Sequence, residues 1–257
     1  MTGRERARYG QEGRRGCAKL QWQDMAWPDM ASYLAHDDRV LVVVGSCEQH
    51  GPHLCFATDT LVPAAIARRA GEAVGVPVTP ALAFGMSEHH LAFPGTISLT
   101  PSTFMAVVGD VLTSLWHHGF HRVVVVNGHG GNQAPLAMTL ATVANRLDGL
   151  RVKVYSWWKA PAVTAAEIRL FGQEEHHAGA AETSAILALH PAGVTLSRAA
   201  AAAPQADTEF VTASRWRRLY PVGAAGPDPR LATAEAGEEL LAAATAELVA
   251  ELEHWPE

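Results

Sequence analysis

Cysteine is scarce in this sequence, and its spacing fits neither a disulfide framework nor a thiolate metal site. The 257 residues include three cysteines, Cys17, Cys47 and Cys55, an odd number without a CxxC pair. Disulfide-stapled domains use paired cysteines in an oxidising compartment, and thiolate zinc sites use closely spaced pairs. The sequence therefore predicts a protein of a reducing compartment, and we expect a cytoplasmic location.

Long apolar runs and an excess of positive charge are also missing. No apolar stretch reaches the roughly 20 residues that span a bilayer, and the N-terminus lacks the apolar core of a signal peptide. The net charge is -6 and the pI is about 6.1, so the chain offers no broad basic surface for a phosphate backbone. We therefore expect neither a membrane nor a nucleic acid as partner, and a small molecule fits better.

The sequence does contain enough apolar material for one large domain. Hydrophobic residues make up 48% of the chain, whose mass is 27.4 kDa. A chain of this size can bury a full core. Residues 1–19 differ from the rest because they hold several arginines among glycines and little that could be buried. We expect a disordered basic tail at 1–19 and a single domain at 20–257.

Apolar runs alternate with helical patterns along this domain. Residues 39–44 and 122–126 contain continuous β-branched stretches, as in the central strands of a parallel sheet. Residues 152–157 predict a further strand, and residues 76–81 a less regular one because two prolines interrupt it. Helical patterns are found at 27–34, 60–73, 101–116, 134–147, 180–189 and 233–252. The alternation predicts an α/β fold with a mostly parallel sheet that helices cover on both faces.

Metal-binding residue types gather where the predicted strands end. Glu48 and His50 follow the first strand two residues apart, so an extended exit points both side chains to one side, and Asp59 can fold back to join them. His129 lies between glycines directly after the strand at 122–126. Glu182 falls on the first turns of an apolar helix, where a buried charge needs a partner such as a metal. Because ligands of parallel sheets bind beyond the carboxyl ends of the strands, we predict a divalent-metal site there.

Each of these residues also has an ordinary explanation. A lone histidine in a chain with 13 of them is usually a surface or hydrogen-bonded side chain, and a lone glutamate on a helix is usually solvated. Asp59 could simply cap the following helix. The conjunction of three such clusters at one edge of the sheet favours a metal site. Nucleotide binding is disfavoured because neither glycine-rich turn has GxGxxG or GxxxxGK[ST] spacing.

Taken together, several segments resemble the creatininase family of amidohydrolases. They span nearly all of the chain outside the tail: 45–54 with Asp59, 93–96, 127–132, 177–179 with 182–184, and 228–229 with 232–235. The resemblance implies a three-layer α/β/α sandwich, two divalent metal ions per chain (zinc, manganese or iron) and a homo-oligomer, often a hexamer. Carried onto this sequence, it implies Glu48, His50, Asp59 and His129 as metal ligands, with Asp59 as the bridge, and His177 as the catalytic histidine.

One position departs from creatininases proper, which carry a glutamate two residues after the histidine that His129 matches. Here that position is Gly131, so the resemblance points to a His-Gly-Gly-Asn subtype of the family. Glu182 is then the expected source of the missing carboxylate.

The implied function is metal-dependent amide hydrolysis, in which a metal-bridging hydroxide attacks the carbonyl and His177 protonates the departing nitrogen. We expect a small amide, linear or cyclic, such as a formamide or a lactam. A peptide bond and the ring opening of a cyclic ketone stay open as alternatives, as does a non-catalytic metal-binding protein. We predict substrate contacts at Trp157, Asn132 and His53, although aromatic residues after a strand fit core packing equally well. The loop with Glu88, His89 and His90 could also reach the site.

Overall fold

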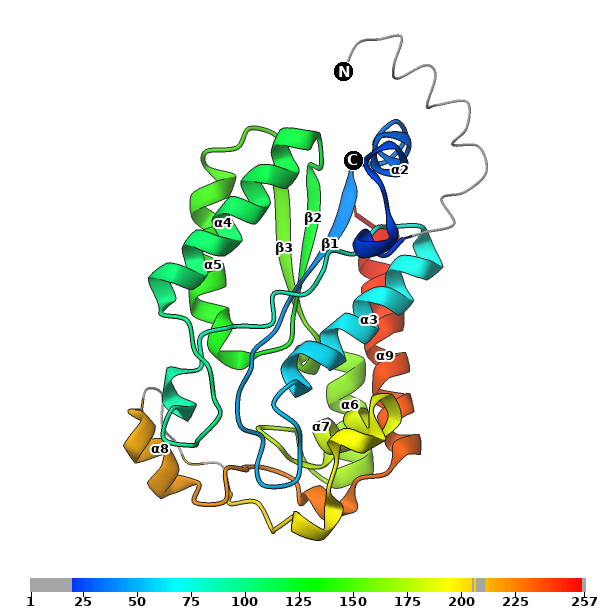
Figure 1. Ribbon diagram of the computed structural model, residues 1–257. Helices are drawn as coiled ribbons and strands as arrows, with labels where there is room; N and C mark the ends of the chain where they lie inside the picture. The colour runs from blue at the N-terminus through cyan, green and yellow to red at the C-terminus, as the bar shows by residue number, and fades with distance from the viewer. Residues whose placement is uncertain (1–19, 205, 207–210, 256–257) are drawn as a thin grey trace.

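A three-stranded parallel sheet forms the centre of the computed structural model, which describes residues 20–204, 206 and 211–255. Its strands lie in the order β1-β2-β3, with β1 at Arg39–Val44, β2 at Arg122–Asn127 and β3 at Arg151–Ser156. The last residues of the three strands are paired in register, so the loops after β1 and β2 leave the sheet side by side (Figure 1). The tail predicted at 1–19 lies outside the described residues.

The strands β1 and β2 are buried on both faces, as their continuous apolar sequence predicts. Val40 and Val42 belong to one hydrophobic cluster, whereas Leu41 and Val43 belong to a second cluster on the opposite face. Each of these four side chains is at most 4% exposed. The sheet is therefore the middle layer between two apolar cores.

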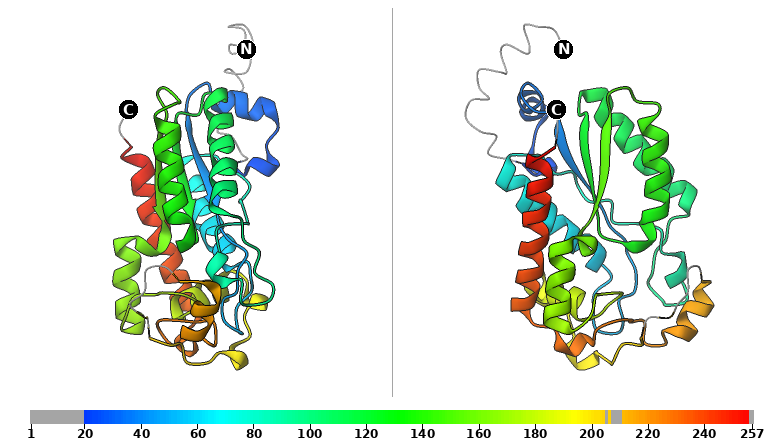
Figure 2. Two further views of the ribbon diagram at one scale, coloured as in Figure 1. Left: turned by 90° about the vertical axis from the view of Figure 1, so that its left-hand side faces the viewer. Right: turned by 180° about the vertical axis from the view of Figure 1, so that it is seen from behind.

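Helices cover both faces of this sheet (Figures 1 and 2). On the side of Val40 lie α2 (Trp27–Tyr33), α4 (Pro101–His118) and α5 (Gln133–Ala144). On the side of Leu41 lie α3 (Thr58–Val74), α6 (Pro161–Phe171), α7 (Ala180–Leu189) and α9 (Ala234–Glu253). These layers confirm the predicted α/β/α sandwich. Among the described helices, none is long and apolar enough to cross a bilayer.

Short helical turns and one further helix complete the chain. The 3-10 helices are η1 (Trp22–Asp24), η2 (Glu88–His90), η3 (Gly130–Asn132), η4 (Trp157–Lys159), η5 (Pro191–Gly193), η6 (Leu196–Arg198) and η7 (Pro229–Leu231). The helix α8 (Ala213–Leu219) lies beyond the carboxyl end of the sheet and has a small apolar cluster of its own around Trp216 (Figure 1). The sequence patterns predicted neither α6 nor α8.

The segment at 76–81 was expected to be a strand and instead forms isolated bridges along the free edge of β1. Val78 pairs with Leu41, and further along Leu82 pairs with Val44. Pro77 and Pro80 have no N–H to donate, so a regular ladder cannot form at these positions. The segment still covers the free edge of β1. Without it, the backbone N–H and C=O groups along that edge would have no strand partner.

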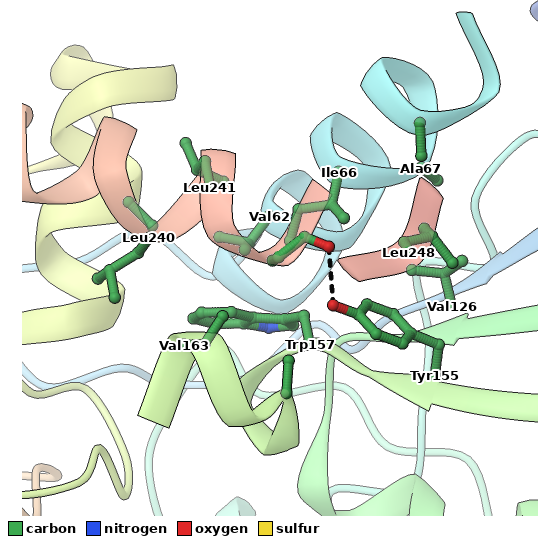
Figure 3. Close-up of a cluster of buried hydrophobic side chains, with 14 of the residues drawn as sticks. Val62, Ile66, Ala67, Val126, Tyr155, Trp157, Val163, Leu240, Leu241 and Leu248 are labelled. Carbon is green, nitrogen blue, oxygen red and sulfur yellow. Dashed lines mark hydrogen bonds between the residues drawn. The ribbon is translucent and has the colours of Figure 1, made fainter. Parts of the chain in front are cut away.

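Trp157 belongs to the core on the side of α3 and α9, where Figure 3 shows its ring among apolar side chains of those helices. It is only 1% exposed, and the neighbouring Tyr155 donates its hydroxyl hydrogen to the Ala244 carbonyl oxygen at 2.8 Å. The ring therefore packs in the apolar core in this structure. The expectation that Trp157 contacts the substrate stays a prediction.

The helices α7 and α9 approach so closely that only glycine fits at position 237. A Cβ at Gly237 would overlap the Ser184 carbonyl group and lie 2.9 Å from the Ala185 nitrogen, both in the α7 backbone. We expect Gly237→Ala to lower the free energy of unfolding by about 3 kcal/mol, because the two backbones must separate. Chemical denaturation measures this change.

Gly109→Ala is the matched control, because a Cβ at that position in α4 would meet only the Thr139 Cγ2 at 4.0 Å. Alanine is the better helix former, so this variant should gain about 0.5–1 kcal/mol. Equal stability of the two variants would contradict the close packing of α7 on α9.

Candidate metal centre

The loop after β1 brings Glu48, His50 and Asp59 together at the carboxyl end of the sheet. His50 Nε2 lies 3.0 Å from Asp59 Oδ1, and one ligand atom from each of the three residues lies within 4.8 Å of the others. All three side chains are at most 3% exposed. Asp59 lies in the first turn of α3, but the N-cap of that helix is Ala57. The alternative interpretation of Asp59 as a helix cap is therefore wrong.

His129 enters the same cluster from the end of β2. Its backbone N–H donates to Asn127 Oδ1 at 3.1 Å, which fixes the turn after the strand. The ring then places Nδ1 at 3.1 Å from Asp59 Oδ2 and Nε2 at 3.3 Å from Glu48 Oε2. The prediction that the two glycine-rich loops converge on one place holds in the structure.

Glu182 reaches the cluster from the N-terminal turn of α7. Its Oε2 lies 3.7 Å from His50 Nε2 and accepts the backbone N–H of Ala178 at 2.6 Å. Glu175 holds this turn by accepting the backbone N–H groups of Ala181 at 2.8 Å and Glu182 at 3.2 Å. Burial, together with the charge of Glu182, raises the pKa of Glu175 to about 8.

The five predicted ligands form two groups that share one residue. Asp59, Glu48 and His129 make one group, and Asp59, His50 and Glu182 make the other. Asp59 Oδ2 is buried and accepts no hydrogen bond, although His129 Nδ1 faces it. An unpaired buried carboxylate oxygen beside an imidazole nitrogen is the donor arrangement that a divalent cation satisfies. The residues present therefore fit a metal.

Charge compensation inside the cluster is strong. Burial lowers the pKa of His50, but the charges of Asp59 and Glu182 outweigh it and hold that pKa well above its usual value. Burial likewise opposes protonation of His129, and Glu48 and Asp59 outweigh it, so its pKa is also raised. The pKa of Asp59 is lowered because the two histidines overcome the effect of burial. The buried carboxylates are thus stabilised by positive charge next to them, which protons on the histidines or bound cations can supply.

The hydrogen bonds of the two histidines leave one nitrogen of each facing Asp59. His50 Nδ1 lies 3.2 Å from the Glu48 carbonyl oxygen, and His129 Nε2 lies 3.0 Å from the Met86 carbonyl oxygen. A ring nitrogen opposite a carbonyl oxygen carries the hydrogen and donates it. His50 Nε2 and His129 Nδ1 are then the nitrogens with lone pairs available for a metal.

His177, the predicted catalytic histidine, lies against the cluster at its more open side. Its ring centroid is 4.6 Å from that of His50, and its Nδ1 is 3.7 Å from Glu48 Oε1. Its Nε2 lies 3.0 Å from the Gln49 carbonyl oxygen, and 12% of the side chain is exposed. Burial and the charge of His50 lower the pKa of His177 well below its usual value.

Asn132 and His53, the other predicted substrate contacts, are buried and bonded to protein groups. Asn132 donates from Nδ2 to the Gly45 carbonyl oxygen at 3.1 Å and accepts the Met86 N–H at 3.0 Å. His53 Nε2 lies 3.1 Å from Thr183 Oγ1. Burial, together with the charge of His50, lowers the pKa of His53 to about 4. Both side chains tie the loops of the site to one another.

Two residues beside the cluster were not assigned a role from the sequence. His90 places Nε2 at 3.4 Å from Glu48 Oε1, and Trp216 of α8 packs edge-on against the His90 ring with centroids 4.3 Å apart. The adjacent pair His89-His90 marked its loop as a possible neighbour of the site, but which ring turns inward depends on the turn η2. No pattern in the sequence pointed to Trp216.

Gly131 cannot carry the glutamate that creatininases proper have at this place without a shift of the backbone. A Cβ there would overlap the Met86 carbonyl oxygen and lie 2.5 Å from His129 Nε2. The absence of a side chain at position 131 is therefore built into the conformation of the loop.

Comparisons with known proteins give matches over most of this chain. The family model for creatininase, described as creatinine amidohydrolase, matches residues 23–252. The chain is 35% identical over 191 residues to the creatinine amidohydrolase of Pseudomonas putida, covering 68% of this chain and 74% of that protein. It is 34% identical over 213 residues to the mycofactocin precursor peptide peptidase of Mycolicibacterium smegmatis, covering 79% of each.

Solved creatininase structures also superpose on this chain. The structure named "Creatininase Mn" superposes with a TM-score of 0.83 at 29% identity, covering 93% of this chain and all of that one. A mutant creatininase described as "Zn-Zn type" superposes with a TM-score of 0.82 at 28% identity, covering 93% of this chain and 99% of that one.

Proposed function

The chain belongs to the creatininase family, and we propose that it hydrolyses the C–N bond of a small amide at a dinuclear metal centre. As a member of this family it is a metal-dependent amidohydrolase. The observation that carries the proposal is the shared position of Asp59, whose two oxygens face different histidines at 3.0 and 3.1 Å. One carboxylate between two groups of ligands is what a pair of cations needs as a bridge.

The proposed centre is held by Glu48 and His129 on one side of Asp59, and by His50 and Glu182 on the other. When bound there, zinc, manganese or iron would supply Lewis acidity, which lowers the pKa of a water molecule toward neutrality and polarises a carbonyl group. Glu182 takes the place of the glutamate that Gly131 cannot provide.

His177 moves the proton in this proposal. Its Nε2 lies 3.0 Å from the Gln49 carbonyl oxygen and 3.0 Å from Gln49 Nε2, so the ring is held with Nδ1 directed at the ligand cluster. At Nδ1 it takes up the proton of the attacking water and delivers it to the departing nitrogen, a role that suits an imidazole. Its position beside the cluster also counts against a non-catalytic metal site, which protein ligands would close completely.

The substrate is a small amide, linear or cyclic, such as a formamide or a lactam. A peptide bond is the second candidate, because the chain is nearly as similar to a peptide peptidase as to a creatinine amidohydrolase. The close packing around Gly131 argues against creatinine itself, since a carboxylate present in creatininases proper has no room here. Ring opening of a cyclic ketone uses the same polarised carbonyl and belongs in the same screen. The cytoplasmic location and the homo-oligomeric, hexameric state stay predictions.

Metal analysis tests the proposal directly. After loading with zinc or manganese and removal of the excess, the protein should retain about two equivalents per chain by plasma mass spectrometry. Glu48→Ala should lose about one equivalent of metal together with the activity, because a ligand on one side of Asp59 is removed. A screen of lactams, formamides, short peptides and cyclic ketones then identifies the substrate class.

Glu88→Ala is the matched control, since Glu88 is an exposed glutamate in the neighbouring turn η2. It should keep the metal content of the wild type. Retention of one equivalent or none by the wild-type protein would refute the dinuclear centre, and full activity of Glu48→Ala would refute the role of the cluster.

A further inference from the structure

The carboxamide of Gln49 is held in one orientation next to the ligand Glu48. Its Oε1 accepts the backbone N–H of Gly51 at 3.0 Å, so the amide nitrogen must point the other way. Gly223 packs directly on this amide, and a Cβ there would overlap Gln49 Oε1. Gln49 is 5% exposed. The amide therefore has a fixed donor end and little room to turn over.

The donor end of this amide sets the tautomer of His90. Gln49 Nε2 lies 3.0 Å from His90 Nδ1, and an amide N–H can be satisfied there only by a nitrogen lone pair. In the neutral ring the hydrogen is then on Nε2, which lies 3.4 Å from Glu48 Oε1. The His90 ring is 2% exposed and packs between the rings of His177, at 4.5 Å, and Trp216, at 4.3 Å.

The two oxygens of Glu48 thus have different surroundings. Oε1 faces His90 Nε2 at 3.4 Å and His177 Nδ1 at 3.7 Å, whereas Oε2 faces His129 Nε2 at 3.3 Å on the side of Asp59 and accepts from Ser46 Oγ at 3.4 Å. An N–H donor on one oxygen of a carboxylate ligand orients the other oxygen toward the metal and raises the affinity of the site. We propose that Gln49 and His90 form a hydrogen-bond relay that holds Glu48 in its metal-binding orientation; this inference rests on the metal centre proposed above.

A competing explanation is that His90 is itself a ligand. Ligand atoms of Glu48, His90 and His177 all lie within 4.8 Å of one another, which a cation could also use. The two explanations differ in what position 90 must offer. The relay needs an N–H donor, which glutamine supplies at nearly the reach of the histidine Nε2. A zinc ligand at this position needs an imidazole nitrogen, for which the glutamine amide oxygen is a poor substitute.

Metal affinity of three variants tests the relay. Gln49→Met and His90→Phe remove the donors while keeping the size of the side chains, and each should weaken zinc binding about 10- to 100-fold. His90→Gln should restore an affinity close to that of the wild type. The affinity is measured by competition with a chromophoric chelator, and the absorption spectrum of the cobalt-loaded proteins should shift in the first two variants only.

Two controls separate the relay from a general loss of stability. Gln173→Met changes an exposed glutamine, and His89→Phe changes the neighbouring ring, which stacks over His129 at 6.0 Å. Both should keep the zinc affinity of the wild type. Wild-type affinity in Gln49→Met, or equal losses in His90→Phe and His90→Gln, would overturn the relay while the wild-type metal content still supported the proposed centre. Absence of metal binding by the wild type would overturn both.

Discussion

Replacement of Asp59 by asparagine is expected to empty both metal positions at once. Each oxygen of Asp59 faces a different histidine, so one substitution removes a ligand from both groups. Asparagine keeps the shape but loses the charge, and breaking a buried ionic cluster in this way costs about 3–5 kcal/mol. We expect the metal content to fall from about two equivalents to none, with activity reduced by roughly 1,000-fold or more. Mass spectrometry of the loaded protein and a hydrolysis assay measure the two effects.

Glu182→Gln is the informative control for Asp59→Asn. Glu182 lies 3.7 Å from His50, on one side of Asp59 only, so its loss leaves Glu48, Asp59 and His129 in place. This variant should keep about one equivalent. If Asp59→Asn kept one equivalent as well, Asp59 would be a ligand of a single cation, and the bridging role would be wrong.

The sequence predicted that Glu48, His50, Asp59 and His129 lie together because they follow buried strands. A β-branched run such as Val40–Val44 in β1 favours a strand covered on both faces, and polar residues directly after neighbouring parallel strands meet at one edge of the sheet. His129 could be assigned in this way from local pattern alone. The choice between helix cap and ligand for Asp59 could not, because both roles place an aspartate at the same position in the sequence.

Features that depend on contacts between distant segments could not be predicted from the sequence. Trp157 follows a strand, and its sequence context fits a pocket wall as well as a core position; only the packing of α3 and α9 over β3 decides that it is buried. His90 becomes a neighbour of Glu48 because Gln49 and Trp216 hold its ring, and these residues are 41 and 126 positions away from it. Such arrangements leave no period or spacing in the chain.

The absence of α8 from the sequence-based prediction has a similar explanation. The helix α8 has seven residues, three of them arginines, and only Trp216 is buried, so it shows no apolar stripe. At 76–81 the prediction was too regular rather than too weak. The apolar residues suggested a strand, but the prolines allow only single bridges to β1. Short elements at the rim of the sheet depend on the elements beneath them more than on their own propensities.

Replacement of His177 by alanine is expected to separate catalysis from metal binding. His177 lies with Nδ1 at 3.7 Å from Glu48 Oε1, close enough to serve a reaction at the cluster. Loss of a general acid–base group lowers turnover by about 100- to 10,000-fold. We expect kcat to fall within this range while the loaded protein still retains about two equivalents of metal. Steady-state kinetics on the substrate found in the screen, with mass spectrometry on the same samples, measure both quantities.

The metal content of His177→Ala decides whether His177 is a metal ligand or a proton-transfer group. Ligand atoms of His177 also lie within 4.8 Å of those of His50 and Glu182, so a cation could in principle recruit the ring. Against this, Nε2 lies 3.0 Å from both the carbonyl oxygen and the Nε2 of Gln49, and Asp59 already places an oxygen 3.0 Å from His50 Nε2. A ligand role predicts that metal and activity are lost together, whereas a proton-transfer role predicts normal metal content and partial recovery of turnover with added imidazole. His176→Ala, at the exposed neighbouring position, should change neither quantity.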